Sequence, residues 1–125
     1  MGSLFTEDAK SLGYVMQILK DRGLFFLDSK TTSKSVGAKV AAEYGVPYIA
    51  RDVFLDNEND YDYIMKQLHL TEKIAHMRGY AVAIGHPRSK TYLALRDWMN
   101  GLSDRKIRLV RLGDLVREVN KKAEN

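Results

Sequence analysis

The chain has 125 residues, 45% hydrophobic and 29% charged, which is typical of a single soluble domain with one core over residues 1–125. Lysine and arginine number 20 against 16 acidic residues, but they are spread along the chain, which argues against nucleic acid as a partner. Cysteine is absent, which excludes thiol nucleophiles, thiolate metal sites and disulfides, and the apolar runs are too short for a membrane span of roughly 20 residues.

The first predicted element is an amphipathic helix. Its apolar residues follow the i, i+3, i+4, i+7 spacing of one helix face: Leu12, Val15, Met16 and Leu19. Thr6 is the predicted N-cap, and Gly23 ends the helix at the usual position for glycine. The apolar run LFFLD, residues 24–28, then predicts a strand that ends in a carboxylate.

The same order of elements is then repeated three times. A short helix over 33–45 ends at Gly45, a strand covers 46–52, and a long helix over 59–79 begins at Asn59 or Asp60 and ends at Gly79. A strand over 81–85 precedes a helix over 89–102. Finally, KIRLVRL, residues 106–112, predicts a strand, and the apolar spacing from Leu112 to Val119 predicts a last helix.

The predicted strands are apolar on consecutive positions rather than on alternate ones. Strands of this kind are buried on both faces, as in a parallel sheet covered by helices. The fold class is therefore α/β, with parallel strands alternating with helices.

Polar residues stand where these strands end. They are Asp28 and Ser29, Arg51 and Asp52, and His86 and Pro87. Functional groups in parallel sheets gather beyond the carboxyl ends of the strands, so we expect these residues to lie at one edge of the sheet. In the loop after the second strand, Asp56 and its polar neighbours follow an apolar triplet that would hold the loop against the core.

Each of these residues also has a purely structural interpretation. His86 could hydrogen-bond a loop carbonyl, and Asp28 could cap the turn that follows it. Asp52 could form an ion pair with Arg51 or a nearby lysine. His69 and His76 are seven residues apart on one predicted helix, too far to share a metal ion, and we interpret them as surface residues.

Three segments together carry a family resemblance: GLFFLDSKTT, YIARDVFLDNE and AIGHP, in this order and spacing. They resemble the carboxyl-terminal two thirds of the divergent polysaccharide deacetylase family, relatives of the NodB-type deacetylases. The opening MGSLFT resembles the family's Asn-His-Met-Gly-Ser segment, entered at its methionine.

The resemblance implies the carboxyl-terminal part of a distorted (β/α) barrel and metal-dependent hydrolysis of acetyl groups on cell-envelope carbohydrate. It assigns catalytic roles to three residues: His86 as the general acid, Asp28 as a strand-end carboxylate, and Asp52, paired with Arg51, as a group that orients a catalytic residue. It implies that substrate contacts come from Ser29, Arg51, Asp56 and Pro87. The cofactor of the complete family fold is a divalent metal, usually zinc, which polarises the acetyl carbonyl and lowers the pKa of a bound water.

The family's early metal ligands have no counterpart in this chain. The paired aspartates of its first strand lie upstream of the matching segment, and the histidine of Asn-His-Met-Gly-Ser would directly precede Met1. The residues named above include one histidine and scattered carboxylates, fewer than the three protein ligands of a catalytic zinc. The chain is then a fragment of a longer protein or a natural short form that has lost hydrolysis. A chain that binds no metal is a further alternative.

Two functions are compatible with these residues. The first is a polysaccharide deacetylase-like hydrolase, and the second is a non-catalytic module that binds carbohydrate or an envelope partner. A nucleotide-binding or receiver-like domain would need a glycine-rich loop or an early acidic pair, which the sequence lacks. The resemblance implies a periplasmic or envelope location, although these residues contain no signal peptide. Part of a barrel would expose sheet edges, so we expect the chain to pair with another copy or to be unstable.

Overall fold

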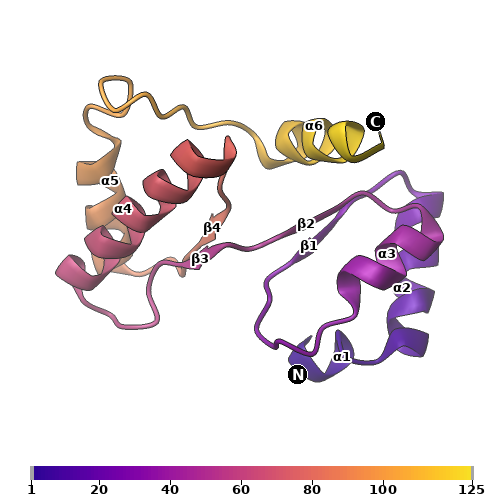
Figure 1. Cartoon of the computed structure of the whole chain (residues 1–125). Coiled ribbons are helices and arrows are strands. Elements are labelled where there is room, and N and C mark those ends of the chain that lie inside the picture. The colour runs from indigo at the N-terminus through magenta and orange to yellow at the C-terminus, as the bar shows by residue number, and fades with distance from the viewer. Residues whose placement is uncertain (1, 125) are drawn as a thin grey trace. The chain divides into compact units, whose positions relative to one another are not determined.

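The computed structural model describes residues 2–124, with side chains up to residue 122. Figure 1 shows the course of the chain, which forms two compact units. The first unit combines the residues up to Ala50 with those from Val110 onward, and the second covers Arg51–Leu109. The expectation of a single domain over residues 1–125 stays a prediction.

The first unit contains a two-stranded parallel sheet and four helices among its described residues. The elements are α1 (Gly2–Phe5), α2 (Ala9–Asp21), β1 (Phe26–Asp28), α3 (Gly37–Tyr44), β2 (Tyr48–Ala50) and α6 (Leu112–Glu124). Phe26 lies opposite Tyr48, and Asp28 lies opposite Ala50. The core lies between α2, α3 and the chain entering β2, and its buried residues are Leu12, Met16, Val40, Ala41 and Val46.

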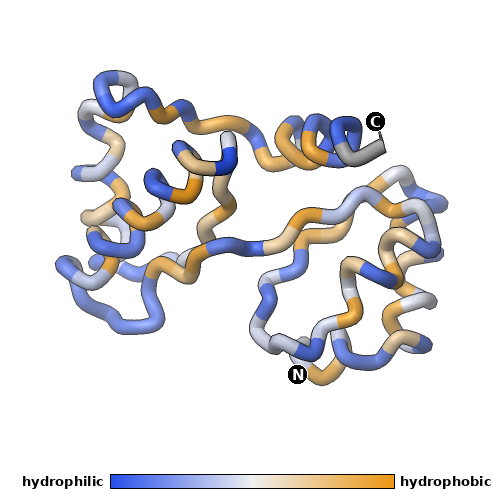
Figure 2. Tube along the Cα trace, in the orientation of Figure 1, coloured by the Kyte–Doolittle hydropathy of each residue, from blue (hydrophilic) through white to orange (hydrophobic). Residues whose placement is uncertain are grey.

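The second unit has the same plan on a smaller sheet. Its elements are β3 (Val53–Phe54), α4 (Tyr61–Arg78), β4 (Ala83–Ile84) and α5 (Ser89–Met99). The two strands are parallel, with Val53 opposite Ala83 and Phe54 opposite Ile84. Its buried core consists of Val53, Leu55, Ile64, Leu68, Ala94 and Trp98. Figure 2 shows β3 and β4 in hydrophobic colours and the loop between β3 and α4 in hydrophilic ones.

Most predicted helix ends are confirmed. Gly45 and Gly79 end α3 and α4 with φ angles of 70° and 100°, a left-handed conformation that favours glycine. Asp60 caps α4 by accepting a hydrogen bond from the amide of Tyr63 at 2.9 Å. Helices alternating with parallel strands confirm the predicted α/β fold class.

The predicted N-cap of the first long helix is wrong. Asp8 caps α2, because its Oδ1 accepts from the amides of Lys10 and Ser11 and its Oδ2 from the Ser11 hydroxyl. Thr6 lies before the helix and donates its hydroxyl to the carbonyl of Ser3. Both residue types cap helices well, so local composition could not decide between them.

Two strand predictions need correction. The strand predicted over 46–52 is shorter, because β2 ends at Ala50 and leaves Arg51 and Asp52 outside it, and a separate strand, β3, follows in the segment expected to be a loop. The predicted strand over 106–112 does not form, and Leu109 and Val110 in this segment are about half exposed. A strand requires a partner backbone to bond its amides and carbonyls, and no strand among residues 2–124 pairs with this segment.

No helix within residues 2–124 combines the length and the apolar character that crossing a membrane requires.

Candidate functional site

The side chains of His86 and Asp56 meet beyond the carboxyl ends of β4 and β3. Because these strands are parallel and adjacent, the residues that follow them emerge side by side. The imidazole Nδ1 of His86 lies 2.8 Å from Asp56 Oδ1, and the backbone amide of His86 donates to Asp56 Oδ2 at 2.6 Å. The sequence predicted both residues for the site, and the structure brings them together.

Asp56 is almost completely buried, with 1% of its surface exposed. Its Oδ2 also accepts a hydrogen bond from the hydroxyl of Thr91 at 2.7 Å, and its backbone carbonyl accepts one from Arg88 at 3.1 Å. Burial alone would raise the pKa of Asp56, but the hydrogen bonds from His86 and Thr91 outweigh it and lower the pKa to about 2. Asp56 is therefore ionised at neutral pH.

The ionised state of Asp56 fixes the arrangement of protons on His86. A carboxylate can only accept hydrogen bonds, so Nδ1 of the imidazole carries a hydrogen and donates it. The other ring nitrogen, Nε2, then holds a lone pair in the neutral ring and a proton in the charged ring. The His86 side chain is 55% exposed, so the imidazole is accessible to a substrate.

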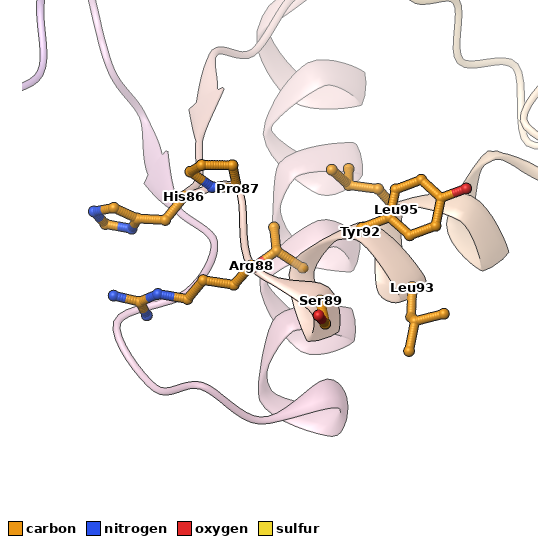
Figure 3. Close-up of a pocket in the computed structure, with 8 residues that line it drawn as sticks. His86, Pro87, Arg88, Ser89, Tyr92, Leu93 and Leu95 are labelled. Atoms are coloured by element: carbon orange, nitrogen blue, oxygen red, sulfur yellow. The ribbon is translucent and has the colours of Figure 1, made fainter.

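A cavity of about 660 Å³ lies beside this pair at the start of α5 (Figure 3). His86 and Arg88 extend to one side of the loop after β4, whereas Tyr92 and Leu93 extend to the other. The lining includes Pro87, Ser89 and Leu95 as well as these four residues. The site thus places polar groups next to an open and mainly apolar surface.

Asp52 has a different environment within the same unit. Its Oδ2 accepts hydrogen bonds from the guanidinium of Arg78 and from the backbone amide of Val82, the latter at 2.7 Å. Arg51 lies over the ring of Phe54, with the guanidinium carbon 4.2 Å from the ring centre. The ion-pair partner that the structure shows for Asp52 is Arg78, at the end of α4. Its predicted catalytic role stays a prediction.

Asp28 belongs to the first unit, at the end of β1, and is 2% exposed. Its Oδ1 accepts from the amide of Lys30 at 2.8 Å, and its Oδ2 accepts from the hydroxyls of Ser35 and Tyr48, both at 2.7 Å. Burial raises the pKa of Asp28, but these hydrogen bonds outweigh it and lower the pKa below the usual value. The bond from Lys30 is the turn cap that the structural interpretation of the sequence anticipated.

A second cavity of about 440 Å³ lies next to Asp28 and Ser29 in the first unit. Its other lining residues come from α1 and from the chain around β1, and they include Ser3, Thr6, Phe26 and Thr31. The convergence of Asp28 with Asp52 and His86 stays a prediction, because Asp28 lies in a unit separate from theirs.

Metal ligands are not grouped in the described part of the chain. No set of three or more histidine, aspartate or glutamate side chains there could hold a metal ion. His69 and His76 are both exposed on α4, which confirms their interpretation as surface residues. The described residues therefore do not fit the catalytic zinc site that the sequence resemblance implies for the complete fold.

Sequence reasoning missed two residues of the site, Thr91 and Arg88. Thr91 contacts Asp56 across 35 positions and Arg88 contacts it across 32. Neither residue stands in a motif, and only the register of β3 against β4 brings them to Asp56.

Comparisons with known proteins show the family of the chain. Residues 1–116 match the model of the divergent polysaccharide deacetylase family. The chain belongs to this family. It is 40% identical to an uncharacterized protein of Haemophilus influenzae over 117 residues, which cover 94% of the chain and 41% of that protein. It is 34% identical to the uncharacterized protein YibQ of Escherichia coli over 118 residues, covering 94% of the chain and 37% of YibQ.

The fold is also found in a solved structure. The crystal structure of an uncharacterized protein from Agrobacterium tumefaciens C58 matches with a TM-score of 0.86 and 28% identity, covering 89% of this chain and 45% of that one. This match confirms the predicted fold class, part of the NodB-like (β/α) barrel of divergent polysaccharide deacetylases. The chain spans about two fifths of the length of the curated relatives.

Proposed function

We propose that the chain contributes the general acid of a hydrolase that removes acetyl groups from cell-envelope carbohydrate, and that His86 is this acid. The observation that carries the proposal is the contact between the buried carboxylate of Asp56 and the exposed imidazole of His86. Such a carboxylate orients the ring and holds it through Nδ1, so that Nε2 is the nitrogen left to donate a proton.

The proposed reaction cleaves the bond between the acetyl carbon and a sugar nitrogen or oxygen. The oxygen of a water molecule bonds to the acetyl carbon and gives up its two protons to the solvent, one of which is returned to His86 after the reaction, and the electron pair of the broken bond stays with the sugar. The Nε2 proton of His86 is transferred to that departing nitrogen or oxygen, and acetate is released. Asp56 keeps its negative charge throughout, as its low pKa requires.

In the complete family fold, a divalent metal would polarise the acetyl carbonyl and activate the water. The described residues do not fit such a site, so this part of the chemistry is not assigned to them. We give the orienting role to Asp56 rather than to Asp52, because Asp56 contacts the imidazole. We keep as proposals a role in the reaction for Asp28 and Asp52. We also keep as a proposal substrate binding by Ser29, Arg51 and Pro87.

A second candidate function is carbohydrate binding without turnover. Tyr92 lines the cavity beside His86, and its ring is 66% exposed. An exposed aromatic ring that lines a cavity offers a flat apolar surface for one face of a sugar ring. This function would need no metal.

Acetate release from tri-N-acetylchitotriose by the full chain, with Zn²⁺ added, tests the first function. His86→Asn should lower the rate by about 10²-fold or more, which is the usual contribution of a general acid. His76→Asn is the matched control, because His76 is an exposed histidine on α4, and this variant should release acetate at the wild-type rate.

Binding of the same trisaccharide, followed by NMR shifts of the Tyr92 and His86 signals, separates the two functions. Binding without acetate release would favour the non-catalytic module. An unchanged rate in His86→Asn would contradict the assignment of the acid, and neither binding nor release would contradict both functions for this substrate.

We also propose a periplasmic or envelope location, because the substrates implied by the family are envelope carbohydrates. Fractionation of cells that express the protein from its native locus tests this. Recovery in the cytosolic fraction alone would contradict it.

A further inference from the structure

Thr91 is a buried polar residue in the first turn of α5. It is 3% exposed, and its hydroxyl donates a hydrogen bond to Asp56 Oδ2 at 2.7 Å. The same oxygen accepts the backbone amide of His86, while Oδ1 faces the imidazole. Both carboxylate oxygens of Asp56 are therefore engaged, Oδ1 by the imidazole of His86 and Oδ2 by the amide of His86 and the hydroxyl of Thr91.

The other branch of Thr91 is packed against the chain that leads to His86. A methyl group added at Gly85 would lie 3.2 Å from Thr91 Cγ2 and 3.5 Å from Asp56 Oδ2, so the Gly85 backbone is close to both. A threonine in a helix divides between two χ1 rotamers, because its hydroxyl can also bond a carbonyl of the preceding turn. Contact of the methyl with Gly85 favours the rotamer that directs the hydroxyl at Asp56.

Two charged or titratable side chains bond Asp56, those of His86 and Arg88. The imidazole of His86 faces Oδ1, and the guanidinium of Arg88 bonds the backbone carbonyl of Asp56 rather than its side chain. Asp56 is nearly inaccessible to water, so a hydrogen bond lost at Oδ2 would not be readily replaced by solvent. The hydroxyl of Thr91 thus holds the carboxylate through Oδ2, whereas the imidazole contacts Oδ1.

We propose that Thr91 is a positioning residue that acts on His86 through Asp56. By fixing the carboxylate, it keeps the hydrogen of the imidazole on Nδ1 and leaves Nε2 as the atom that meets the substrate. The effect on hydrolysis rests on the proposed function, whereas the effect on the imidazole does not.

The experiment is NMR of the full chain with ¹⁵N-labelled histidine and ¹³C-labelled aspartate carboxyls, without any substrate. Thr91→Val removes the hydroxyl and keeps the branched shape, and Thr91→Ser keeps the hydroxyl and removes the methyl. His69 and His76 are internal references, because they lie exposed on α4. The imidazole ¹⁵N shifts report which ring nitrogen carries the hydrogen.

In Thr91→Val, the pKa of Asp56 should rise by roughly one pH unit, the value of one hydrogen bond to a charged group. The His86 signals should move from the Nδ1–H form toward a mixture of both forms, while the two reference histidines stay unchanged. Thr91→Ser should restore the wild-type shifts. Where hydrolysis is measurable, kcat of Thr91→Val should fall about tenfold with little change in KM.

Unchanged His86 shifts and an unchanged pKa of Asp56 in Thr91→Val would overturn the proposal. A Thr91→Ser variant that behaves like Thr91→Val would overturn it as well, because packing of the methyl would then be the cause. If Thr91→Val does not fold, Thr91→Ala removes the hydroxyl without adding bulk and is compared with Thr91→Ser in the same way. The NMR measurements do not depend on acetate release. A failure of the proposed function would therefore leave the expected changes in the His86 shifts and in the Asp56 pKa unaffected.

Discussion

His86 and Asp56 contact each other twice, through the imidazole Nδ1 at 2.8 Å and the backbone amide at 2.6 Å. Two bonds to one buried carboxylate fix both the chain that leaves β4 and the rotation of the ring. The same carboxylate therefore supports the fold and orients the candidate acid, and its protonation should affect both.

Protonation of Asp56 should destabilise the protein at low pH. The pKa of Asp56 is about 2 in the folded state against an ordinary value of 3.8. A carboxyl with a depressed folded pKa contributes stability above its unfolded pKa, and this contribution is lost as the pH falls from about 4 toward 2. The full difference corresponds to about 2 kcal/mol of unfolding free energy, and about half of it should be lost between about pH 7 and about pH 3, as measured by urea unfolding at the two pH values.

Two variants separate Asp56 from the other acidic groups. Asp56→Asn should be less stable near neutral pH and should lose less stability over the acid window than wild type. Asp62→Asn, at an exposed position in the first turn of α4, should follow the wild-type curve. Equal acid sensitivity of wild type and Asp56→Asn would show that the buried carboxylate is not the group responsible.

Tyr48→Phe should destabilise the first unit. The hydroxyl of Tyr48 donates to the buried carboxylate of Asp28 at 2.7 Å, and removing it leaves that oxygen with one donor fewer. Hydrogen bonds to charged groups contribute roughly 1.5–3 kcal/mol, so a loss of this size is expected in urea unfolding. Tyr92→Phe is the matched control, because Tyr92 is 66% exposed and its hydroxyl loss should cost nothing measurable.

Gly37→Ala should also disturb the environment of Asp28. A methyl group at Gly37 would lie 2.7 Å from Asp28 Oδ2 and 3.2 Å from Ser35 Oγ. The carboxylate cannot retreat without breaking its hydrogen bonds, so we expect a cost of roughly 1–3 kcal/mol in thermal or urea unfolding. Gly2→Ala, with no atom within 4 Å of the added methyl, should be neutral. If Gly37→Ala were as stable as the wild type, the backbone at this position would be able to shift and make room for the methyl group without loss of stability.

The sequence predicted helices and their ends well, because these depend on residues that are close together in the chain. Gly45 and Gly79 end their helices as expected. A glycine that follows a stretch of helically spaced apolar residues marks the helix end by itself, because the left-handed conformation depends only on the residue and its immediate neighbours. The segment over 106–112 has the composition of a strand but not its structure. A strand also requires a partner, and the composition of a segment carries no information about that partner.

The candidate site could be predicted only in part for the same reason. His86 and Asp56 were found because each follows an apolar strand or loop. Their mutual contact spans 30 positions and depends on the pairing of β3 with β4. Thr91 had no signal at all, since a threonine in the first turn of a helix is common and its burial arises from tertiary packing.

Self-association is the last prediction. Each described sheet has two strands, so every strand has one strand neighbour among residues 2–124. The side chain of Asn120 bonds the amide and the carbonyl of Tyr48 in β2, but the edges of the second sheet have no such cover among the bonds seen within the described residues. Unpaired edges favour pairing with another chain, and large apolar side chains are exposed on α2, where Tyr14 and Ile18 are more than half exposed.

We therefore expect the mass measured by light scattering to rise with concentration in the micromolar range, or the purified chain to unfold without a sharp thermal transition. Tyr14→Lys together with Ile18→Lys should reduce association if the apolar face of α2 contributes to it. A monomer with a sharp thermal transition at the same concentrations would show that the exposed edges are tolerated in solution.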